Sequence, residues 1–483
     1  MPNAPLKQRT AKGLFWGGFS NGVLQLIYIV YGIYIARILH QDDFGVLCAL
    51  AIFSGIANTI INSGFSSALI NKSDAAHGDY NAVFWFSLFM GLFLYLLLFL
   101  CAPLIARFYG RPELTALSRI VFTGLIFGSL SVVPYAVFVK KLMTKQYGII
   151  SIISVFISCA AATIIARQGY GYWALAFQQL IQIFVGALLT VIICPWKPTF
   201  SFDFSPLKQL FSFSFKILIT GIFSIINTNI FAVILAKFYS MTDVGNYSQG
   251  QKWSAMGASF ISGMFACVTQ PVLVEIGDEK ARQVNALRKL IRCGAFLSFP
   301  LMLGLAFVGR EFIQIALGEM WLPAVPFLQL FCLWNAASFL HTLFTNLIFT
   351  RGKSGLYMKI NIITGLLQLV LIAAMYPFGI FPMIAGYLAL YLLSLFVWHY
   401  HVKQLIGLQL RDALKDILPY LGITLLCFGV AWLTTRNIQN LYLLISLKIG
   451  ISALLYVFVM KTSNSVMFKE SVGFLMGNKK RIQ

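Results

Sequence analysis

Several large polar side chains lie inside long apolar stretches, where they could bind a polar ligand. Two such stretches, within 211–271, contain Lys216, Asn227, Gln249, Lys252 and Gln270. Ammonium and amide groups are costly in hydrocarbon unless they face a cavity or reach an interface. These residue types donate hydrogen bonds and positive charge, so the chemistry they offer is binding.

Helical spacing decides whether these side chains converge, because positions 7, 11 and 18 apart return to about the same face of a helix. Lys216, Thr220 and Asn227 share one face, and Lys252 shares another with Gln270. Gln249 lies at the margin of that second face. Further stripes comprise Asn21 with Gly17, Gln25 and Tyr28; Asn335 with Ser338, Thr342 and Asn346; Asn62 with Ser54 and Asn58; Gln182 with Gln178 and Gln179; and Asn361 with Gln368.

Two interpretations of these stripes are open. Polar stripes in membrane helices often serve helix packing through interhelical hydrogen bonds. That interpretation is as good as a cavity for the stripes around Asn62, Gln182 and Asn361. A water-filled cavity is favoured for the stripes that contain Lys216, Lys252, Asn21 and Asn335, since several large polar groups need more partners than packing supplies.

The lysines have an alternative of their own, since a lysine near a helix end can extend its ammonium group to the interface. The cavity is slightly favoured for Lys216 and Lys252. For Lys448, which resembles Lys252 but lies outside the internal repeat described below, we expect the interfacial position.

The composition places these residues in a polytopic membrane protein. Of 483 residues, 59% are hydrophobic and 11% are charged, and the mean hydropathy is +0.82. Spans of roughly 20 apolar residues are the useful unit. The sequence predicts an all-α protein with 14 transmembrane helices: 13–36, 46–70, 81–105, 117–139, 148–166, 172–193, 211–236, 246–271, 291–308, 325–350, 357–375, 380–398, 417–435 and 441–460.

The charges predict the orientation of the chain. Most of the 36 Lys and Arg residues fall in loops on the side of the two termini, which places both termini in the cytoplasm. The net charge of +21 is therefore a topology signal, and we expect no nucleic-acid partner. All 15 Asp and Glu residues lie outside the predicted spans, which argues against an intramembrane carboxylate proton relay.

An internal repeat appears when the chain is shifted by 200 residues. Ala36-Arg37, followed by Asp43-Phe44-Gly45, aligns with Ala236-Lys237, followed by Asp243-Val244-Gly245. Spans 1–6 and 7–12 therefore form two pseudo-symmetric six-helix lobes. We predict an N-lobe at 1–200, a C-lobe at 201–405, and two further helices with a cytoplasmic tail at 406–483.

Enzymatic motifs are absent from the sequence. It has no Walker A, GxGxxG, HExxH or GxSxG motif, and the eight cysteines are scattered without a CxxC pair. We expect a non-enzyme with no catalytic residue, metal site or cofactor.

Several motifs resemble those of Wzx-type polysaccharide flippases of the MOP (multidrug/oligosaccharidyl-lipid/polysaccharide) exporter superfamily, near the colanic and teichuronic acid exporter branch. These motifs cover roughly residues 10 to 400. They are Ala36-Arg37-Ile38-Leu39 with Asp43-Phe44-Gly45; Gly64-Phe65 with Ala68-Leu69-Ile70; Asp79-Tyr80-Asn81 with Val83-Phe84-Trp85; Gly171-Tyr172-Trp173-Ala174-Leu175; Lys237-Phe238 with Gly245-Asn246-Tyr247; and Gly318-Glu319-Met320-Trp321-Leu322-Pro323-Ala324-Val325-Pro326.

The resemblance implies a function and partners. It implies an alternating-access flippase in the bacterial inner membrane that moves undecaprenyl-pyrophosphate-linked oligosaccharide to the outer leaflet, beside the polysaccharide polymerase and export machinery. A cationic, hydrogen-bonding cavity suits such a substrate. The candidate substrate-binding residues are Lys216, Lys252, Asn227, Gln249, Gln270, Asn21, Gln25, Asn335 and Asn346. A cation or drug antiporter of the same superfamily and a membrane glycan polymerase or ligase are the alternatives.

Overall fold

The protein is built from helices, as its apolar composition predicts. The computed structural model describes residues 6–62, 64–72, 74–200, 202–203, 205–277, 279–463 and 467–470. Within these ranges the side chains of 6–15, 205–206, 208–214, 216–217, 266–268, 270–271, 274 and 354 are not described. No strand occurs in the described ranges, which agrees with the need of a lipid-embedded backbone to pair its polar groups within each segment.

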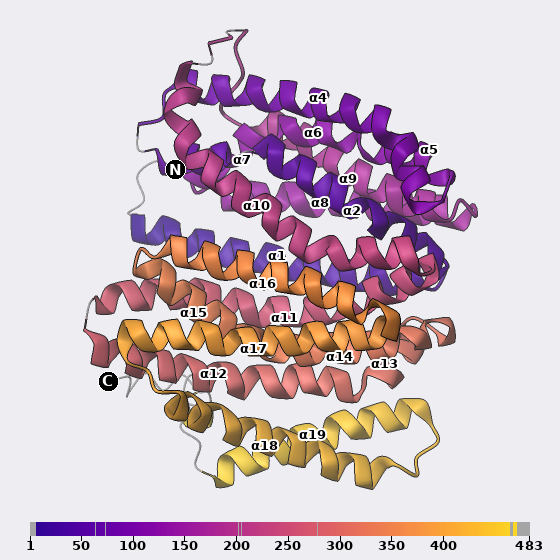
Figure 1. The fold of residues 1–483 in the computed structure, drawn as a ribbon, viewed down its shortest axis with the longest axis vertical. Coiled ribbons are helices and arrows are strands. Elements are labelled where there is room, and N and C mark those ends of the chain that lie inside the picture. The colour runs from indigo at the N-terminus through magenta and orange to yellow at the C-terminus, as the bar shows by residue number, and fades with distance from the viewer. Residues whose placement is uncertain are drawn as a thin grey trace. The chain divides into compact units, whose positions relative to one another are not determined.

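The chain divides into two compact units, Met1–Ser248 and Gln249–Gln483. Unit 1 contains the indigo to magenta helices of Figure 1: α1 (Leu6–Ala36), α2 (Gln41–Asn62), α3 (Phe65–Asn71), α4 (His77–Tyr109), α5 (Glu113–Val121), α6 (Gly124–Leu130), α7 (Val132–Lys140), α8 (Thr144–Arg167), α9 (Tyr172–Ile193) and α10 (Ser205–Phe238). Helix α10 packs against α2, α3 and α4. The predicted division into 1–200, 201–405 and 406–483 follows the sequence repeat rather than packing and stays a prediction.

Unit 2 contains the remaining helices, with the unit boundary inside the first of them. They are α11 (Met241–Ile276), α12 (Lys280–Phe307), α13 (Gly309–Ala316), η1 (Glu319–Ala324), α14 (Val325–Ala336), α15 (Ser338–Thr350), α16 (Ser354–Met375), η2 (Tyr376–Phe378), α17 (Ile380–Ile406), α18 (Leu410–Thr435) and α19 (Leu441–Thr462).

The described residues contain 13 helical stretches long and apolar enough to cross a membrane. They overlap every predicted span except 246–271, which lies on the 36-residue helix α11. This span includes 266–268 and 270–271, whose side chains lie outside the described residues, so its apolar length is not tested. The multi-span character is confirmed, and the fourteenth span stays a prediction carried by α11.

The order of the helices repeats along the chain as predicted. Long helices with an internal proline, α4 with Pro103 and α12 with Pro300, occupy equivalent places in the two copies. In each copy the predicted fourth span is interrupted: α6 passes into α7 at Ser131, and α14 passes into α15 at Ala337. Prolines and small breaks thus recur at equivalent positions of the two repeats.

The two repeated motifs contact each other within unit 1, at the start of α2 and α11. A Cβ atom on Gly45 would lie 2.0 Å from the carbonyl oxygen of Met241, and one on Gly245 would lie 2.0 Å from that of Gln41. Only glycine allows backbones to approach so closely. Side chains add a Thr242–Asp42 hydrogen bond and a Gln41–Asn246 bond of 3.0 Å. The repeat detected in the sequence is therefore also a near-symmetric contact.

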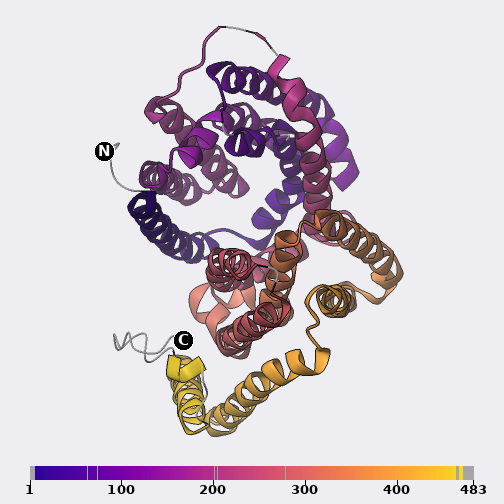
Figure 2. The ribbon, with the colours of Figure 1, turned by 90° about the vertical axis from the view of Figure 1, so that its left-hand side faces the viewer.

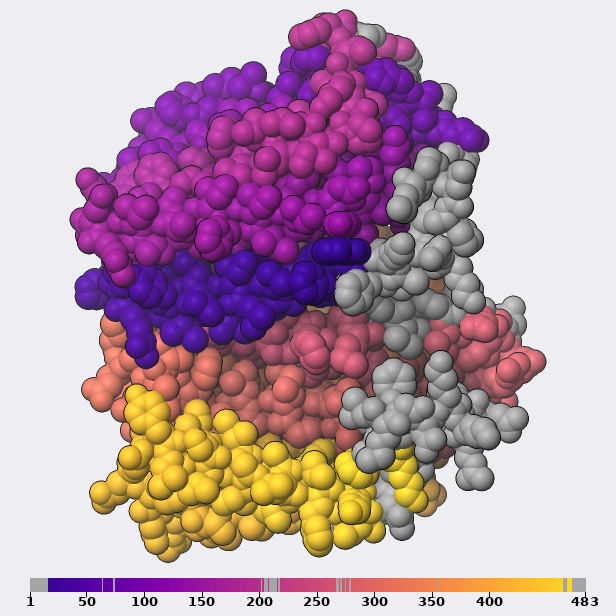
Figure 3. All heavy atoms as spheres, turned by 180° about the vertical axis from the view of Figure 1, so that it is seen from behind, coloured from indigo at the N-terminus to yellow at the C-terminus, as the bar shows by residue number. Residues whose placement is uncertain are grey.

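In unit 2, helices α18 and α19 pack against each other, and α18 packs along α12 (Figure 2). Figure 3 shows their yellow atoms as a continuous layer beside the salmon segments of the same unit. Arg288 of α12 donates from Nε and Nη2 to the buried carboxylate of Asp416 at 2.7 and 3.2 Å. This two-point contact fixes α18 on α12.

Lys448 has a partner that the sequence analysis did not foresee. Its Nζ lies 2.6 Å from Glu311 Oε1, with only 11% of the lysine side chain and 8% of the glutamate side chain exposed. Its expected position at the membrane interface stays a prediction. The ammonium also lies 4.7 Å from the ring centroid of Phe307. The missed partner is 137 residues away in the sequence, so helical spacing could not identify it.

Candidate functional site

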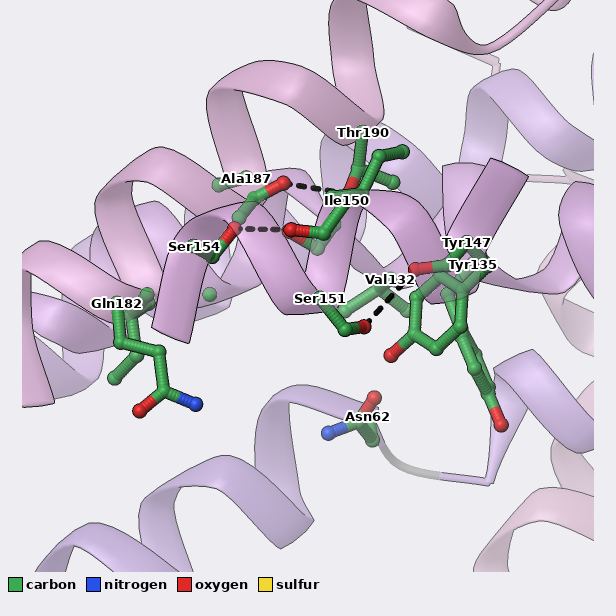
Figure 4. Close-up of a pocket in the computed structure, with 14 residues that line it drawn as sticks. Asn62, Val132, Tyr135, Tyr147, Ile150, Ser151, Ser154, Gln182, Ala187 and Thr190 are labelled. Atoms are coloured by element: carbon green, nitrogen blue, oxygen red, sulfur yellow. Dashed lines mark hydrogen bonds between the residues drawn. The ribbon is translucent and has the colours of Figure 1, made fainter. Parts of the chain in front are cut away.

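A cavity of about 360 Å³ with both polar and apolar lining lies among the helices of unit 1 (Figure 4). Its volume falls at the lower end of the roughly 300–1,000 Å³ that is usual for small-molecule sites. The lining comes from the end of α2 and from α6, α7, α8 and α9: Asn62, Gly128, Ser131, Val132, Tyr135, Tyr147, Ile150, Ser151, Ser154, Gln182, Ile183, Gly186, Ala187 and Thr190.

Two helices supply most of the polar lining because their side chains repeat at helical spacing. Tyr147, Ser151 and Ser154 of α8 lie on one face, four and seven residues apart. Gln182 and Thr190 of α9 lie eight residues apart and also share a face. Since α8 and α9 pack side by side, these two stripes meet at the cavity.

The hydroxyl groups of the lining donate to backbone carbonyls of their own helices. Ser151 Oγ donates to the Tyr147 carbonyl at 3.0 Å, and Ser154 Oγ donates to that of Ile150 at 2.7 Å. Thr190 Oγ1 makes the equivalent bond on α9. These bonds anchor the side chains without using the oxygen lone pairs.

The amide groups are also held by neighbours. Asn62 Nδ2 donates to the Asn58 carbonyl at 2.8 Å. Gln182 Nε2 donates to Tyr28 Oη of α1 at 2.9 Å. This second bond joins two stripes found in the sequence, those around Asn21 and Gln182.

Two tyrosines form one end of the cavity. The rings of Tyr135 and Tyr147 meet edge to face with centroids 5.3 Å apart, a favoured aromatic geometry. They are 40% and 39% exposed. In Figure 4 Gln182 lies at the opposite end, and Asn62 lies across from Ser151. The cavity thus offers aromatic surface and hydroxyl and amide groups.

The lining contains no Asp, Glu, Lys, Arg or His. In the described part of the chain, no group of three or more His, Cys, Asp or Glu side chains is placed to hold a metal ion. Such a cavity is suited to binding a neutral ligand with many hydroxyl groups.

The predicted site residues of unit 1 do not line this cavity. Asn21 and Gln25 lie on α1, the former exposed and the latter partly buried, and Asn227 is a partly buried residue of α10. Lys216 belongs to α10, but its side chain lies outside the described residues. A role for these four residues in substrate binding stays a prediction.

In unit 2 the structure brings several predicted residues to one turn of α11. Gln249 Oε1 accepts a hydrogen bond from Trp253 Nε1 at 3.1 Å, and its buried Nε2 has no hydrogen-bond partner among the described residues. Lys252 Nζ lies 5.8 Å from the ring centroid of Trp253. Asn335 Nδ2 of α14 donates to Ser254 Oγ at 2.8 Å. This polar cluster is compatible with either helix packing or ligand binding.

The two other predicted residues of unit 2 are not joined to that cluster. Asn346 is a partly buried residue of α15. Gln270 belongs to α11, but its side chain lies outside the described residues. Their role stays a prediction.

The sequence analysis recognised part of the cavity and missed the rest. The stripes containing Asn62 and Gln182 were identified, but helix packing was an equally good explanation for them. Tyr147, Ser151 and Ser154 were overlooked, although their helical spacing was a usable signal. Thr190 was overlooked as well, although it shares a helix face with Gln182, whereas only the packing of α7 identifies Tyr135.

Motif residues outside the cavity have structural roles. A Cβ atom on Gly171, whose φ is +52°, would lie 2.8 Å from Asp43 Oδ1, so the Gly171-Tyr172 turn packs on the start of α2. His40 N donates to Asp43 Oδ2 at 2.9 Å. Trp321 is fully buried in unit 2. These motifs stabilise turns rather than line the cavity.

Comparison with known proteins identifies a matching family. Residues 34–326 match the model of a family described as "Polysaccharide biosynthesis protein". The chain is also similar to the teichuronic acid biosynthesis protein TuaB of Bacillus subtilis (strain 168). The two are 23% identical over 463 residues, which cover 94% of this chain and 96% of TuaB.

Solved structures share the fold of this chain. The inward closed conformation of the lipid II flippase MurJ superposes with a TM-score of 0.75 at 14% identity, covering 92% of this chain and 99% of that one. An inward-facing multidrug resistance MATE family transporter of the MOP superfamily gives a TM-score of 0.62 at 14% identity, covering 79% and 95%.

Proposed function

Because the chain belongs to the family of polysaccharide biosynthesis proteins, we propose that it is an alternating-access flippase for oligosaccharide units linked to undecaprenyl pyrophosphate. It moves these units across the bacterial inner membrane for polysaccharide export. The name of the MurJ structure describes a flippase of another lipid-linked saccharide, and the shared fold supports this assignment.

One observation carries the proposal: a cavity without charged residues, lined in part by hydroxyl and amide groups, lies among helices that are apolar enough to span a membrane. A glycan crossing the bilayer must exchange its hydrogen bonds with water for hydrogen bonds within the protein, since unpaired polar groups are costly there. The cavity supplies such partners inside unit 1, while the apolar outer surfaces of the helices suit the polyprenyl tail.

Export of a cation or drug is the second candidate, because the fold is shared with MATE transporters. A cation is favoured by a carboxylate close to it, since opposite charges attract strongly where water is scarce. The lining of the unit 1 cavity provides hydroxyl and amide oxygens and no carboxylate. This lining favours the glycan over the cation.

Reconstitution of the full chain tests the proposal. Proteoliposomes would contain the purified protein and a fluorescent oligosaccharide linked to undecaprenyl pyrophosphate, and a membrane-impermeant quencher would report exposure in each leaflet. We expect protein-dependent movement between leaflets without new glycosidic bonds. New glycosidic bonds would instead indicate a polymerase or ligase. If neither movement between leaflets nor new bonds were observed, the result would favour the cation or drug antiporter.

The two lysines of the predicted binding set are tested in the same assay. We expect Lys216→Ala and Lys252→Ala to slow flipping at unchanged protein levels in the membrane, because each removes a cation that can bind the pyrophosphate. Initial flipping rates at equal protein content provide the measurement. Wild-type rates in both variants would show that these ammonium groups only reach the interface.

A further inference from the structure

We propose that the unit 1 cavity binds a neutral sugar ring of the transported glycan and disfavours acidic sugars. This inference rests on the proposed function and adds the chemical selectivity of one site.

The hydroxyl groups of the cavity are acceptors toward a ligand. A hydroxyl carries one donor hydrogen and two acceptor lone pairs. Ser151, Ser154 and Thr190 each direct the hydrogen to a backbone carbonyl of their own helix. Ser154 and Thr190 are almost fully buried, so the lone pairs of the partly exposed Ser151 are the most accessible ones to which a sugar hydroxyl can donate.

The amide of Asn62 adds an acceptor on the other side of the cavity. One N–H of its amide donates to the Asn58 carbonyl at 2.8 Å, which leaves the oxygen as an acceptor and the second N–H as a donor. Asn62 and Ser151 face each other across the cavity in Figure 4. Acceptors therefore lie on two opposite sides of the space.

An ionised carboxylate or phosphate fits this lining poorly. Such groups only accept hydrogen bonds at neutral pH, and the lining holds no Lys, Arg or His to balance their charge. Bringing an anion beside acceptor oxygens also costs it its hydration. The pyrophosphate of the carrier and any acidic sugar must therefore be bound elsewhere.

Tyr135 and Tyr147 complete the fit to a sugar ring. Their edge-to-face rings are partly exposed at one end of the cavity. An aromatic face carries partial negative charge, and the C–H groups on one side of a pyranose ring are its natural complement. The hydroxyl groups of the sugar can then point toward Ser151 and Asn62.

Binding of simple glycosides tests the selectivity directly. The full-length protein in lipid nanodiscs would be mixed with methyl glucoside, methyl galactoside or methyl mannoside, and with methyl glucuronide as the acidic analogue. Saturation-transfer NMR reports binding of each. We expect at least one neutral glycoside to bind, and the glucuronide to bind more weakly than the best of them. Failure of all neutral glycosides, or equal binding of the glucuronide, would overturn the inference.

Matched serine variants localise the binding to the cavity. Ser151→Ala removes one acceptor, and a lost hydrogen bond corresponds to roughly 3- to 10-fold weaker binding. Ser158→Ala is the control, because Ser158 lies two turns further along α8, also donates to a carbonyl of its own helix, and does not line the cavity. We expect wild-type binding from the control. Equal glycoside binding by the Ser151 variant and its control would contradict the site.

A second variant keeps the test independent of hydrogen-bond strength. Ser151→Lys places a cation in the cavity and is expected to shift the preference from the neutral glycoside to the glucuronide. Thermal unfolding of each variant confirms that the protein is folded. A folded lysine variant that keeps the wild-type preference would place the glycoside outside this cavity.

The flipping assay separates this inference from the proposed function. Flipping by the wild type together with unchanged glycoside binding in Ser151→Ala and Ser151→Lys would reject the sugar site and keep the flippase. Selective glycoside binding that these variants alter, without flipping of the lipid-linked oligosaccharide, would keep the sugar site and reject the flippase.

Discussion

Individual residues contribute to the stability of each unit through buried charge and close backbone contact. Lys448 and Glu311 form a buried ion pair in unit 2, and Gly45 and Gly245 let backbone segments touch in unit 1. Neither arrangement tolerates a simple substitution, because one leaves a buried charge unpaired and the other overlaps atoms. Both make predictions at the residue scale.

Lys448→Met is expected to destabilise the protein. Removing one partner of a buried ion pair leaves the other charge uncompensated and typically costs about 3–5 kcal/mol. The midpoint of thermal unfolding in detergent measures the effect. The double variant Lys448→Met with Glu311→Gln serves as the control, and we expect it to regain stability because no buried charge remains unpaired. A single variant as stable as the wild type would contradict a buried pair.

Gly45→Ala is expected to weaken the contact between the repeated motifs. The added methyl group would lie 2.0 Å from the Met241 oxygen, and overpacking of this kind typically costs about 1–3 kcal/mol. Gly22→Ala on α1 is the matched control, since a Cβ atom there meets nothing within 4 Å. Thermal unfolding of both variants provides the comparison. Equal unfolding midpoints in the two variants would show that the two backbone segments can separate without a loss of stability.

At the scale of elements, α12 supports the C-terminal helix pair. Arg288 binds Asp416 through two hydrogen bonds, and Arg292 Nε lies 3.7 Å from the same carboxylate. Tyr456 of α19 donates to the Phe296 carbonyl of α12 at 2.9 Å. Charged contacts from α12 thus bind the first turns of α18, whereas Tyr456 binds α19 to α12 through an uncharged hydrogen bond.

Arg288→Ala is therefore expected to loosen the start of α18. Hydrogen bonds to charged groups contribute about 1.5–3 kcal/mol, and the partial exposure of Arg288 favours the lower end. Hydrogen exchange of peptides from 410–420 should accelerate, while those from α19 change less. Arg282→Ala is the control, since the exposed Arg282–Glu279 pair contributes little. Unchanged exchange in the Arg288 variant would assign the docking of α18 to apolar contacts alone.

For the whole molecule, the loop charges predict the orientation of the helices in the membrane. With α11 counted as the fourteenth span, we expect an even number of crossings and both termini on the same side. Loops rich in Lys and Arg remain cytoplasmic during insertion. The proposed transport direction depends on this orientation.

Reporter fusions test the orientation. A fluorescent protein joined after residue 483 is expected to fluoresce, and alkaline phosphatase at the same place is expected to be inactive, because both outcomes require the cytoplasm. A phosphatase fusion after Arg436, in the turn between α18 and α19, is the matched control and should be active. An active phosphatase at the C-terminus would show that this end lies outside the cytoplasm, so that either the orientation or the number of spans differs from the prediction.

The sequence by itself determined the properties that depend on composition and periodicity. Apolar stretches of membrane-spanning length must form helices, because lipid offers no hydrogen bonds to the backbone. The same pattern, shifted by 200 residues, predicted the repeat, and short motifs predicted the family. Each of these signals lies within one segment or between two copies of it.

Only the tertiary structure decided which segments lie beside one another. The cavity needs side chains from α2, α6, α7, α8 and α9, and no single helix among them carries a complete binding pattern. The partner of Lys448 lies 137 residues away on α13. Such contacts depend on how helix surfaces fit together, and helical periodicity gives the face of a residue but not what that face meets.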